Sequence, residues 1–167
     1  MPYNLLKKYN ALLELDSMGQ QERTASLKMI FERDFVKNEN FKFRNKKLNP
    51  TPKDGKISME TFFTHLTTCE VNTAEKKREY DRHRSIRLHW IKYHIEEQKK
   101  DNVYIFSAKD KDGIRTYIYD IKEFYVIVLE PLRASAEYYL LSAYYLRGKD
   151  KFKIENKYKK RRLPDLY

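Results

Sequence analysis

The sequence lacks the cysteines that a disulfide bond needs and the histidine spacing that a structural metal site needs. Its 167 residues include one cysteine, Cys69, which has no partner within the chain. The four histidines, at positions 65, 83, 89 and 94, do not combine with it in the spacing of a zinc finger or ribbon. A chain near this length buries roughly 68 to 70% of its unfolded surface, so a hydrophobic core can form without disulfide bonds or metal ions. We therefore expect neither a metal ion nor a cofactor.

Glycine is scarce, and this excludes the common nucleotide-binding loops. The four glycines stand at positions 19, 55, 113 and 148. Neither a Gly-x-Gly-x-x-Gly fingerprint nor a Gly-x-x-x-x-Gly-Lys-Ser/Thr loop can be written with them. Dinucleotide chemistry and P-loop nucleotide chemistry are therefore excluded.

Long hydrophobic runs are also missing. The longest apolar run is Phe124–Leu129, far short of the roughly 20 residues that a membrane-spanning helix needs. The segment Met1–Asn10 lacks the apolar stretch of a signal peptide. We expect a soluble cytoplasmic protein with no membrane partner.

Positive charge is what the sequence has in excess. Lysine and arginine number 35 against 24 acidic residues, a formal net charge of +11. Such a charge attracts polyanions, so nucleic acid is the leading class of partner. The alternative is that the Lys-, Asn-, Ile- and Tyr-rich composition reflects an AT-rich genome and has no binding role.

The first 75 residues are predicted to form a helical extension or a small accessory domain. Apolar residues recur with the helical period in Tyr3–Leu13 and from about Gln21 to Val36. The polar segment Asn38–Gly55 is interrupted by two X-Pro steps, so we expect a linker or loop. Ser58 can cap a short helix over Ser58–Thr67, although the same residues tolerate a strand.

Residues 76–167 are predicted to form an α+β domain, in which a helix precedes a four-stranded, mainly antiparallel β-sheet. The helix is expected from about Lys76 to Lys100. The step Asp112-Gly113 is typical of a hairpin turn. Pro131 is expected to end the third strand, and the aromatic residues of the last segment favour a strand over a helix. The four expected strands are Val103–Ala108, Ile114–Tyr119, Phe124–Leu129 and Glu137–Leu146.

Charged residues fall on the inward face of the expected helix. At 3.6 residues per turn, Arg84, Arg87 and His94 lie within the arc of its apolar residues, whereas His89 and Lys92 point away. A charge on an inward face needs a partner or lines a cleft. Arg87 and His94 are therefore the main catalytic candidates. The alternative is that Arg87 bridges a buried carboxylate and His94 is a core histidine.

Two strands add polar and aromatic candidates. In the second strand Arg115, Tyr117 and Tyr119 alternate with apolar residues, so one face is predicted to present an arginine beside two aromatic rings. Such a face can hold phosphate and stack bases, although tyrosine is also common in strands for packing. Ser142 is a small polar residue in an aromatic run, which suggests a donor to a phosphate oxygen. A serine merely tolerated in the strand is the alternative.

The tail from Lys149 to Arg162 is strongly basic. It carries eight Lys or Arg residues against two acidic residues, a net charge of +6. Phosphate binding by such a run is salt-dependent and indifferent to sequence. A solvated terminal surface is the alternative.

The order of these parts resembles the barnase/EndoU/colicin/RelE-like ribonuclease superfamily, especially its phage-encoded branch of small nuclease domains. The resemblance covers about Arg78 to Arg162. It implies helices followed by a four-stranded sheet, RNA cleavage without a metal ion, a helix arginine at Arg87, and a Ser/Thr-Ala-Tyr step at Ser142 and Tyr144. The paired histidines of the EndoU branch are absent. The residues that carry the resemblance are Arg84-Ser-Ile-Arg87-Leu-His-Trp90-Ile, the first two strands, Tyr125-Val-Ile-Val-Leu, and Tyr139-Leu-Leu-Ser142-Ala-Tyr144 with the basic tail.

The sequence thus predicts a metal-independent, toxin-like or phage-related endoribonuclease in which a 2′-hydroxyl attacks the adjacent phosphodiester. His94 is expected to act as base or acid, Arg87 and Arg115 as phosphate clamps, and Ser142 and Tyr144 as oriented donors. Because a free ribonuclease is toxic in a cytosol, we also expect an acidic immunity or antitoxin protein. The alternatives are a non-catalytic RNA- or DNA-binding module and a phage-related interaction protein whose charge is compositional. The residues expected to bind nucleic acid are Arg84, Tyr117, Tyr119, Lys157, Lys160 and Arg161.

Overall fold

The computed structural model describes residues 3–161, 163 and 166–167. The chain divides into two compact units, each made of segments distant in sequence. The first unit comprises Met1–Phe41 and Pro52–Glu96, and the second comprises Lys42–Thr51 and Glu97–Tyr167. The expected boundary at residue 75 falls inside the first unit. Within the described residues, no helix combines the length and the apolar composition needed to cross a membrane.

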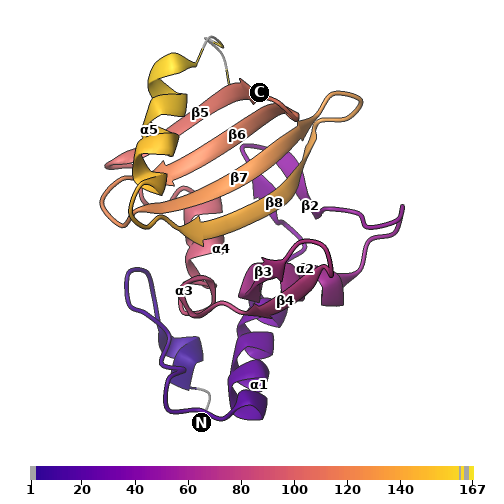
Figure 1. Ribbon diagram of the computed structural model, residues 1–167, viewed down its shortest axis with the longest axis vertical. Coiled ribbons are helices and arrows are strands. Elements are labelled where there is room, and N and C mark those ends of the chain that lie inside the picture. The colour runs from indigo at the N-terminus through magenta and orange to yellow at the C-terminus, as the bar shows by residue number, and fades with distance from the viewer. Residues whose placement is uncertain (1–2, 162, 164–165) are drawn as a thin grey trace. The chain divides into compact units, whose positions relative to one another are not determined.

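The second unit is built on a curled, mixed six-stranded sheet (Figure 1), so the α+β class is confirmed and the expected number of four strands is wrong. The strand order is β1-β2-β8-β7-β6-β5. Strands β2 and β8 are parallel, and every other neighbouring pair is antiparallel. The strands are β1 (Lys42–Phe43), β2 (Lys46–Pro50), β5 (Val103–Asp110), β6 (Gly113–Asp120), β7 (Tyr125–Leu132) and β8 (Glu137–Tyr145).

The four expected strands correspond to β5 through β8, which follow one another as an antiparallel meander. Gly113 turns the first hairpin with φ of 122°, a backbone conformation that favours glycine. Strand β7 continues through Pro131 to Leu132, so the expectation that Pro131 ends it is wrong. Pro131 has a ladder partner only in β8, because β6 pairs with β7 no further than Leu129. A missing backbone N–H is tolerated at such a position.

The two additional strands come from the segment expected to be a linker. Strands β1 and β2 form a hairpin whose connecting residues, Arg44 and Asn45, have φ of 47° and 68°. Positive φ at both connecting residues matches the right-handed twist of a tight hairpin. Phe43 and Leu48 are buried, which anchors the hairpin to the sheet. The linker prediction is therefore wrong.

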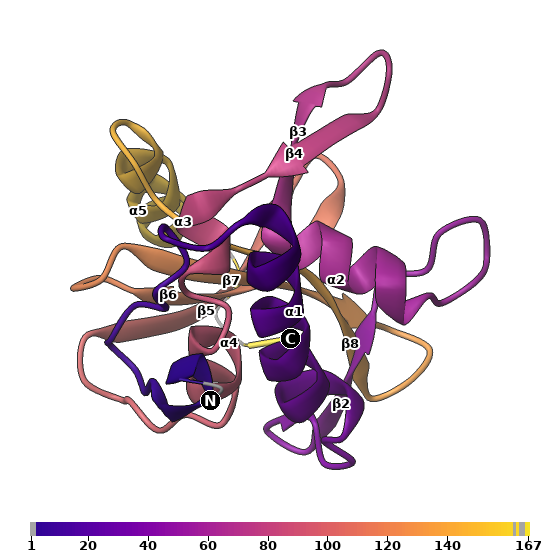
Figure 2. The ribbon, with the colours of Figure 1, turned by 90° about the horizontal axis from the view of Figure 1, so that it is seen from below.

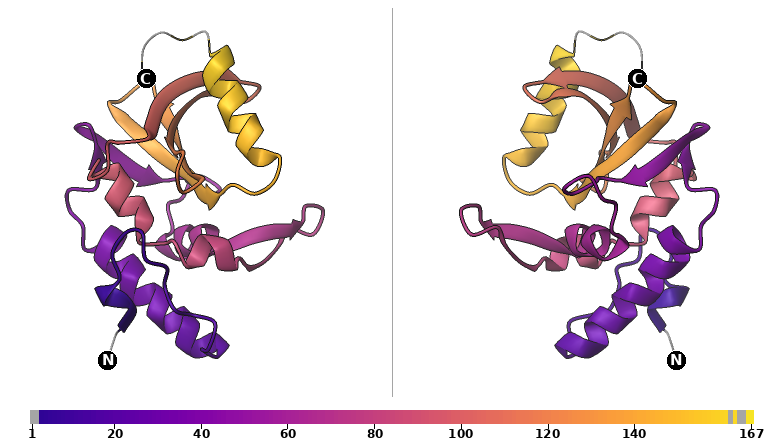
Figure 3. Two further views of the ribbon diagram at one scale, coloured as in Figure 1. Left: turned by 90° about the vertical axis from the view of Figure 1, so that its left-hand side faces the viewer. Right: turned by 90° about the vertical axis from the view of Figure 1, so that its right-hand side faces the viewer.

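Helix α5 (Asp150–Lys160) lies across one face of the sheet (Figure 3). Its Ile154 packs into a cluster that includes Phe106, Tyr117, Tyr119 and Val126. Tyr117 and Tyr119 are only 3% and 0% exposed, so the expectation that they present an open aromatic face is wrong. Residues Asp150–Lys160 of the basic tail form the helix that covers them, and Arg162 lies outside the described residues.

The first unit contains the remaining helices and a two-stranded sheet. Strands β3 (Thr68–Asn72) and β4 (Lys77–Tyr80) pair as an antiparallel hairpin that extends away from α2 (Met59–Thr67) (Figure 2). The expected helix over Gln21–Val36 is present as α1 followed by one π-helical segment, whereas Tyr3–Leu13 contains only a single 3-10 turn. The elements are η1 (Tyr3–Leu6), α1 (Gln20–Phe31), η2 (Glu32–Val36), α2 (Met59–Thr67), β3 (Thr68–Asn72), β4 (Lys77–Tyr80), α3 (Arg82–Ser85) and α4 (Trp90–Ile95).

Helix α2 begins where Ser58 was expected to cap it. The Ser58 hydroxyl accepts a hydrogen bond from the amide of Thr61 at 3.2 Å. Phe62 and Phe63 on α2 are buried, and both rings contact Phe31 of α1. Capping and burial thus select the helix over the alternative strand.

The expected long helix from Lys76 to Lys100 is wrong. Its first residues form β4, and the Asp81 side chain then caps α3 by accepting a hydrogen bond from the Arg84 amide at 3.1 Å. The backbone between α3 and α4 continues as turns. Breaking the helix changes which side chains point inward, and His89 is buried at 5% exposure although it was expected to point away.

Candidate nucleic-acid interface and active site

Strand register brings the candidates of the second unit to one face of the sheet. Two neighbouring rows of side chains cross three strands of the sheet. In each row, a residue of β7 pairs with a residue of β6 on one side and with a residue of β8 on the other. Directly paired residues share a face of the sheet. The rows are Tyr117–Val128–Ser142 and Tyr119–Val126–Tyr144. Because the cluster beneath α5 contains both rows' β6 and β7 residues, we call this side the α5 face.

An arginine and a glutamate continue this face toward the ends of the strands. Arg115 precedes Tyr117 by two residues, so it also lies on the α5 face. Its Nη1 atom is 3.2 Å from Oε1 of Glu130, and the two side chains are 15% and 32% exposed. Sequence reasoning missed Glu130. The available signal was a single acidic residue directly after the apolar run Phe124–Leu129.

Arg115 and Glu130 line a pocket of about 670 Å³ at the ends of β6 and β7, which we call the strand-end pocket. Lys46 and Arg133 also line it, as does Asp112 from the turn between β5 and β6. The pocket therefore combines cationic side chains that can hold a phosphate with a partly exposed carboxylate that can accept a proton.

A second hollow, of about 490 Å³, lies between α5 and β5, and we call it the basic groove. None of its described lining residues is acidic. Lys157 Nζ lies 3.6 Å from Oδ2 of Asp110, which also accepts a hydrogen bond from the hydroxyl of Tyr117 at 3.2 Å. The basic lining residues are Lys109, Lys153, Lys157, Lys160 and Arg161. The structure thus brings together the expected phosphate-binding residues of the tail.

Aromatic rings underlie the basic side chains of α5. The guanidinium of Arg161 lies 3.9 Å from the centre of the Tyr158 ring, which stacks on Tyr104 at 4.6 Å. Lys157 Nζ lies 5.6 Å from the centre of the Tyr117 ring. These contacts hold the cations in place beside the groove.

Tyr117 and Tyr119 cannot stack on a nucleic-acid base, because both rings are enclosed in the core. Burial raises the pKa of the Tyr117 phenol, and the neighbouring Asp110 carboxylate adds to the effect. Burial also raises the pKa of Tyr119. The structure corrects the prediction that these two rings form an open binding surface and gives them a packing role.

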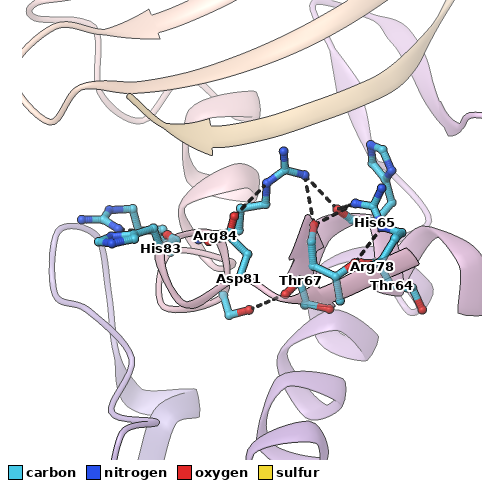
Figure 4. Close-up of polar contacts among 10 residues, drawn as sticks. Thr64, His65, Thr67, Arg78, Asp81, His83 and Arg84 are labelled. Carbon is cyan, nitrogen blue, oxygen red and sulfur yellow. Dashed lines mark hydrogen bonds and ion pairs between the residues drawn. The ribbon is translucent and has the colours of Figure 1, made fainter. Parts of the chain in front are cut away.

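Arg84 belongs to the first unit, where it caps the carboxyl end of α2 together with Arg78 (Figure 4). Its Nη1 donates to the carbonyl oxygens of His65 at 3.1 Å and Thr68 at 3.3 Å. Its Nε lies 3.5 Å from Oδ2 of Asp81. Cations at a helix carboxyl end satisfy its last carbonyl groups and the helix dipole. These contacts give Arg84 a structural role in this unit.

Arg87 and His94 also lie in the first unit and are both buried, at 8% and 2% exposure. Arg87 Nη1 donates to the carbonyl of His83 at 2.9 Å, and its guanidinium lies 5.3 Å from the centre of the Trp90 ring. His94 Nδ1 donates to the carbonyl of Trp90 at 2.8 Å. Tyr9 meets the His94 ring edge-on at 5.0 Å. The inward orientation of both side chains is as expected, and their catalytic roles stay predictions.

The five expected catalytic residues are thus divided between the two units. The first unit holds Arg87 and His94, and the second holds Arg115, Ser142 and Tyr144 on the α5 face. Within residues 3–161, 163 and 166–167, no group of three or more His, Cys, Asp or Glu side chains is arranged to hold a metal ion. Comparisons with protein-family models, curated proteins and solved structures find no match for this chain.

Proposed function

We propose that the protein is an endoribonuclease that needs no metal ion and holds RNA on the α5 face and in the basic groove. The observation that carries the proposal is that Arg115, Ser142 and Tyr144 share one sheet face, which is the face that the basic helix α5 partly covers. A cleavage site and a phosphate-binding surface are therefore both supported within one unit.

The basic groove supplies the binding part of this function. Four lysines and one arginine line it. Lys157 and Lys153 lie beside the carboxylates of Asp110 and Asp150, so the five cations exceed these two acidic neighbours and the groove stays positively charged. Lysine side chains hold phosphates as point charges, without reading base sequence. Binding should therefore be general for RNA and should weaken with salt.

The strand-end pocket supplies groups for the chemistry. In the proposed step, Glu130 accepts the proton of the 2′-hydroxyl as its oxygen attacks the adjacent phosphorus, and Arg115 stabilises the extra negative charge on the pentacoordinate phosphate. The bond to the 5′-oxygen then breaks, and that oxygen takes a proton from a water molecule, whose hydroxide is neutralised by the proton that Glu130 carries. The products are a 2′,3′-cyclic phosphate and a 5′-hydroxyl. Ser142 and Tyr144 do not line the strand-end pocket, and they are proposed as donors to phosphate oxygens of flanking nucleotides along the α5 face.

Glu130 takes the role of base in this proposal because its carboxylate is 32% exposed beside Arg115, whereas the His94 ring is enclosed. The sequence assigns acid–base work to His94 and phosphate binding to Arg87. That assignment has its own test: alanine at both positions should abolish cleavage, provided that circular dichroism shows the variant is folded. A folded double variant that cleaves at the normal rate would remove both residues from the mechanism.

Cleavage of a labelled single-stranded RNA in EDTA tests the proposed pocket. We expect Arg115→Gln and Glu130→Gln each to slow cleavage by about 100-fold or more, because each removes a group that acts in the transition state. Arg147→Gln is the matched control, because it removes one exposed arginine of the same unit. Equal rates for Glu130→Gln and the control would contradict the role of the pocket.

A non-catalytic RNA-binding module is the second candidate, and the basic groove favours it because binding alone requires no catalytic group. This alternative predicts RNA that shifts on a native gel, in a salt-dependent way, and stays intact. The same incubation therefore separates the two functions.

The activity of such an endoribonuclease has to be inhibited in the cell that makes it, because it would cleave that cell's own RNA. We propose an acidic inhibitory protein, since a negatively charged surface would complement the basic groove. Full activity in a stoichiometric mixture with each co-encoded protein would count against this partner.

A further inference from the structure

Phe152 is an exposed aromatic side chain that the packing of α5 does not explain. It is 63% exposed, more than any other large hydrophobic side chain of the described residues. The helix is anchored to the sheet by Ile154, which is 3% exposed, and by Tyr158. A phenylalanine that contributes so little to the core is a candidate contact for a ligand.

The helical repeat places Phe152 at the end of the basic groove. Residues four apart on a helix lie on the same side, one turn above another. Two such rows run along this side of α5, and every member except Phe152 lines the groove. The rows are Phe152–Asn156–Lys160 and Lys153–Lys157, and Arg161 follows the second row just past the end of the helix. The exposed ring therefore continues a row that leads directly into the set of phosphate-binding cations.

We propose that Phe152 stacks on an unpaired base of RNA whose phosphates occupy the basic groove, so that the groove selects single-stranded over duplex RNA. The proposal rests on the function proposed above and adds the base-contacting residue. An aromatic ring beside a cationic track is the arrangement by which proteins bind single strands. In a duplex each base is already stacked and paired, so the ring gains no such contact.

The same features favour RNA over a membrane surface as the partner. A helix that lies in a bilayer interface presents a wide apolar face. On α5 the other apolar side chains, Ile154 and Tyr158, pack against the sheet, which leaves Phe152 alone among lysines. A single ring next to a groove fits one base better than it fits a lipid layer.

Fluorescence anisotropy with the full chain and 2′-O-methyl RNA tests this inference without cleavage, because the methyl group blocks the attacking oxygen. The probes are a labelled single strand and the same strand annealed to its complement. Phe152→Leu keeps an apolar side chain but removes the aromatic face, and Phe152→Trp keeps the aromatic face. Both changes are at an exposed position, so folding is preserved.

We expect Phe152→Leu to weaken single-strand binding about 5-fold or more with an unchanged salt slope, since stacking contributes about that factor per base. Phe152→Trp should restore the affinity, and duplex binding should be the same for all three proteins. Unchanged single-strand affinity in Phe152→Leu, an equal loss for duplex, or Phe152-dependent binding to anionic phosphatidylserine vesicles instead of RNA would overturn the inference. Absence of RNA binding by the unaltered protein would instead overturn the proposed function itself.

Discussion

His89 makes the stability of the protein depend on pH. Its Nε2 donates to the carbonyl of Ala11 at 2.9 Å, and burial lowers the pKa of the imidazole from 6.5 to about 4. As pH falls below 6.5, the His89 imidazole binds a proton in the unfolded chain but stays neutral in the folded chain. The histidine's contribution is therefore fully present above pH 6.5 and is lost on acidification toward pH 4. Urea unfolding at pH 7 and pH 4.5 should show a loss of about 2 kcal/mol from this group.

The matched variant is His89→Gln, whose amide can donate to the same carbonyl but does not titrate. The comparison has to be made between proteins, because the buried Asp34 also makes the free energy of unfolding depend on pH, with the opposite sign. Burial raises the pKa of Asp34, so the stability contribution of its neutral form is lost as pH rises. Equal pH dependence in the variant and the unaltered protein would contradict the role given to His89.

At the scale of elements, Ser58 is expected to determine the stability of α2. Its hydroxyl satisfies the Thr61 amide, one of the donors left open at the start of the helix. Ser58→Ala should lower the free energy of unfolding by about 1 kcal/mol, as for other N-caps. Urea denaturation provides the measurement, with Ser58→Asp as the variant that retains a cap. Equal stability of the alanine and aspartate variants would show that the cap contributes nothing.

Helix α5 carries the prediction about salt dependence. Lys157 and Lys160 line the basic groove, and replacing both by glutamine removes two phosphate contacts. The slope of log affinity against log salt for single-stranded RNA should then decrease by about 1.4. Lys100→Gln/Lys122→Gln removes the same charge at exposed positions of the same unit. Identical slopes for the two double variants would mean that net charge, and not the groove, attracts RNA.

The sequence predicted elements well where short-range signals agree. The alternation of Ile114–Tyr119 and the Asp112-Gly113 turn sufficed for β5 and β6, and the apolar run Phe124–Leu129 for β7. The helix over Lys76–Lys100 failed because the pairing of β4 with β3 and the cap at Asp81 outweigh its helical period. Helical periodicity alone therefore predicted that the His89 side chain points away from the core, whereas it is buried.

At the scale of the whole molecule, long-range pairing is what the sequence could not reveal. Strand β2 pairs in parallel with β8, joining Leu48 to Tyr138 across 90 positions. No local pattern marks such a pair, and for the same reason the partnership of Arg115 with Glu130 was missed. The expected exposure of Tyr117 and Tyr119 failed because the basic tail folds as α5 over them. The tail's charge was predicted, and its packing was not.

The two units interleave along the chain, and this determines which experiments are informative. Residues 42–51 complete the sheet of the second unit, although residues on both sides of them belong to the first. A fragment beginning at residue 76 would lack β1 and β2 and would expose the parallel edge of β8. Tests of binding and cleavage therefore use the full chain.

The most direct test of the proposed function is to identify the ends that the full-length protein leaves on RNA in EDTA. A synthetic single strand is incubated with the protein, and the fragments are analysed by mass spectrometry. The account predicts 2′,3′-cyclic phosphate or 3′-phosphate ends paired with 5′-hydroxyl ends, and no fragments with Glu130→Gln. Intact RNA, or fragments with 5′-phosphate ends, would contradict attack by the 2′-hydroxyl and with it the proposed mechanism.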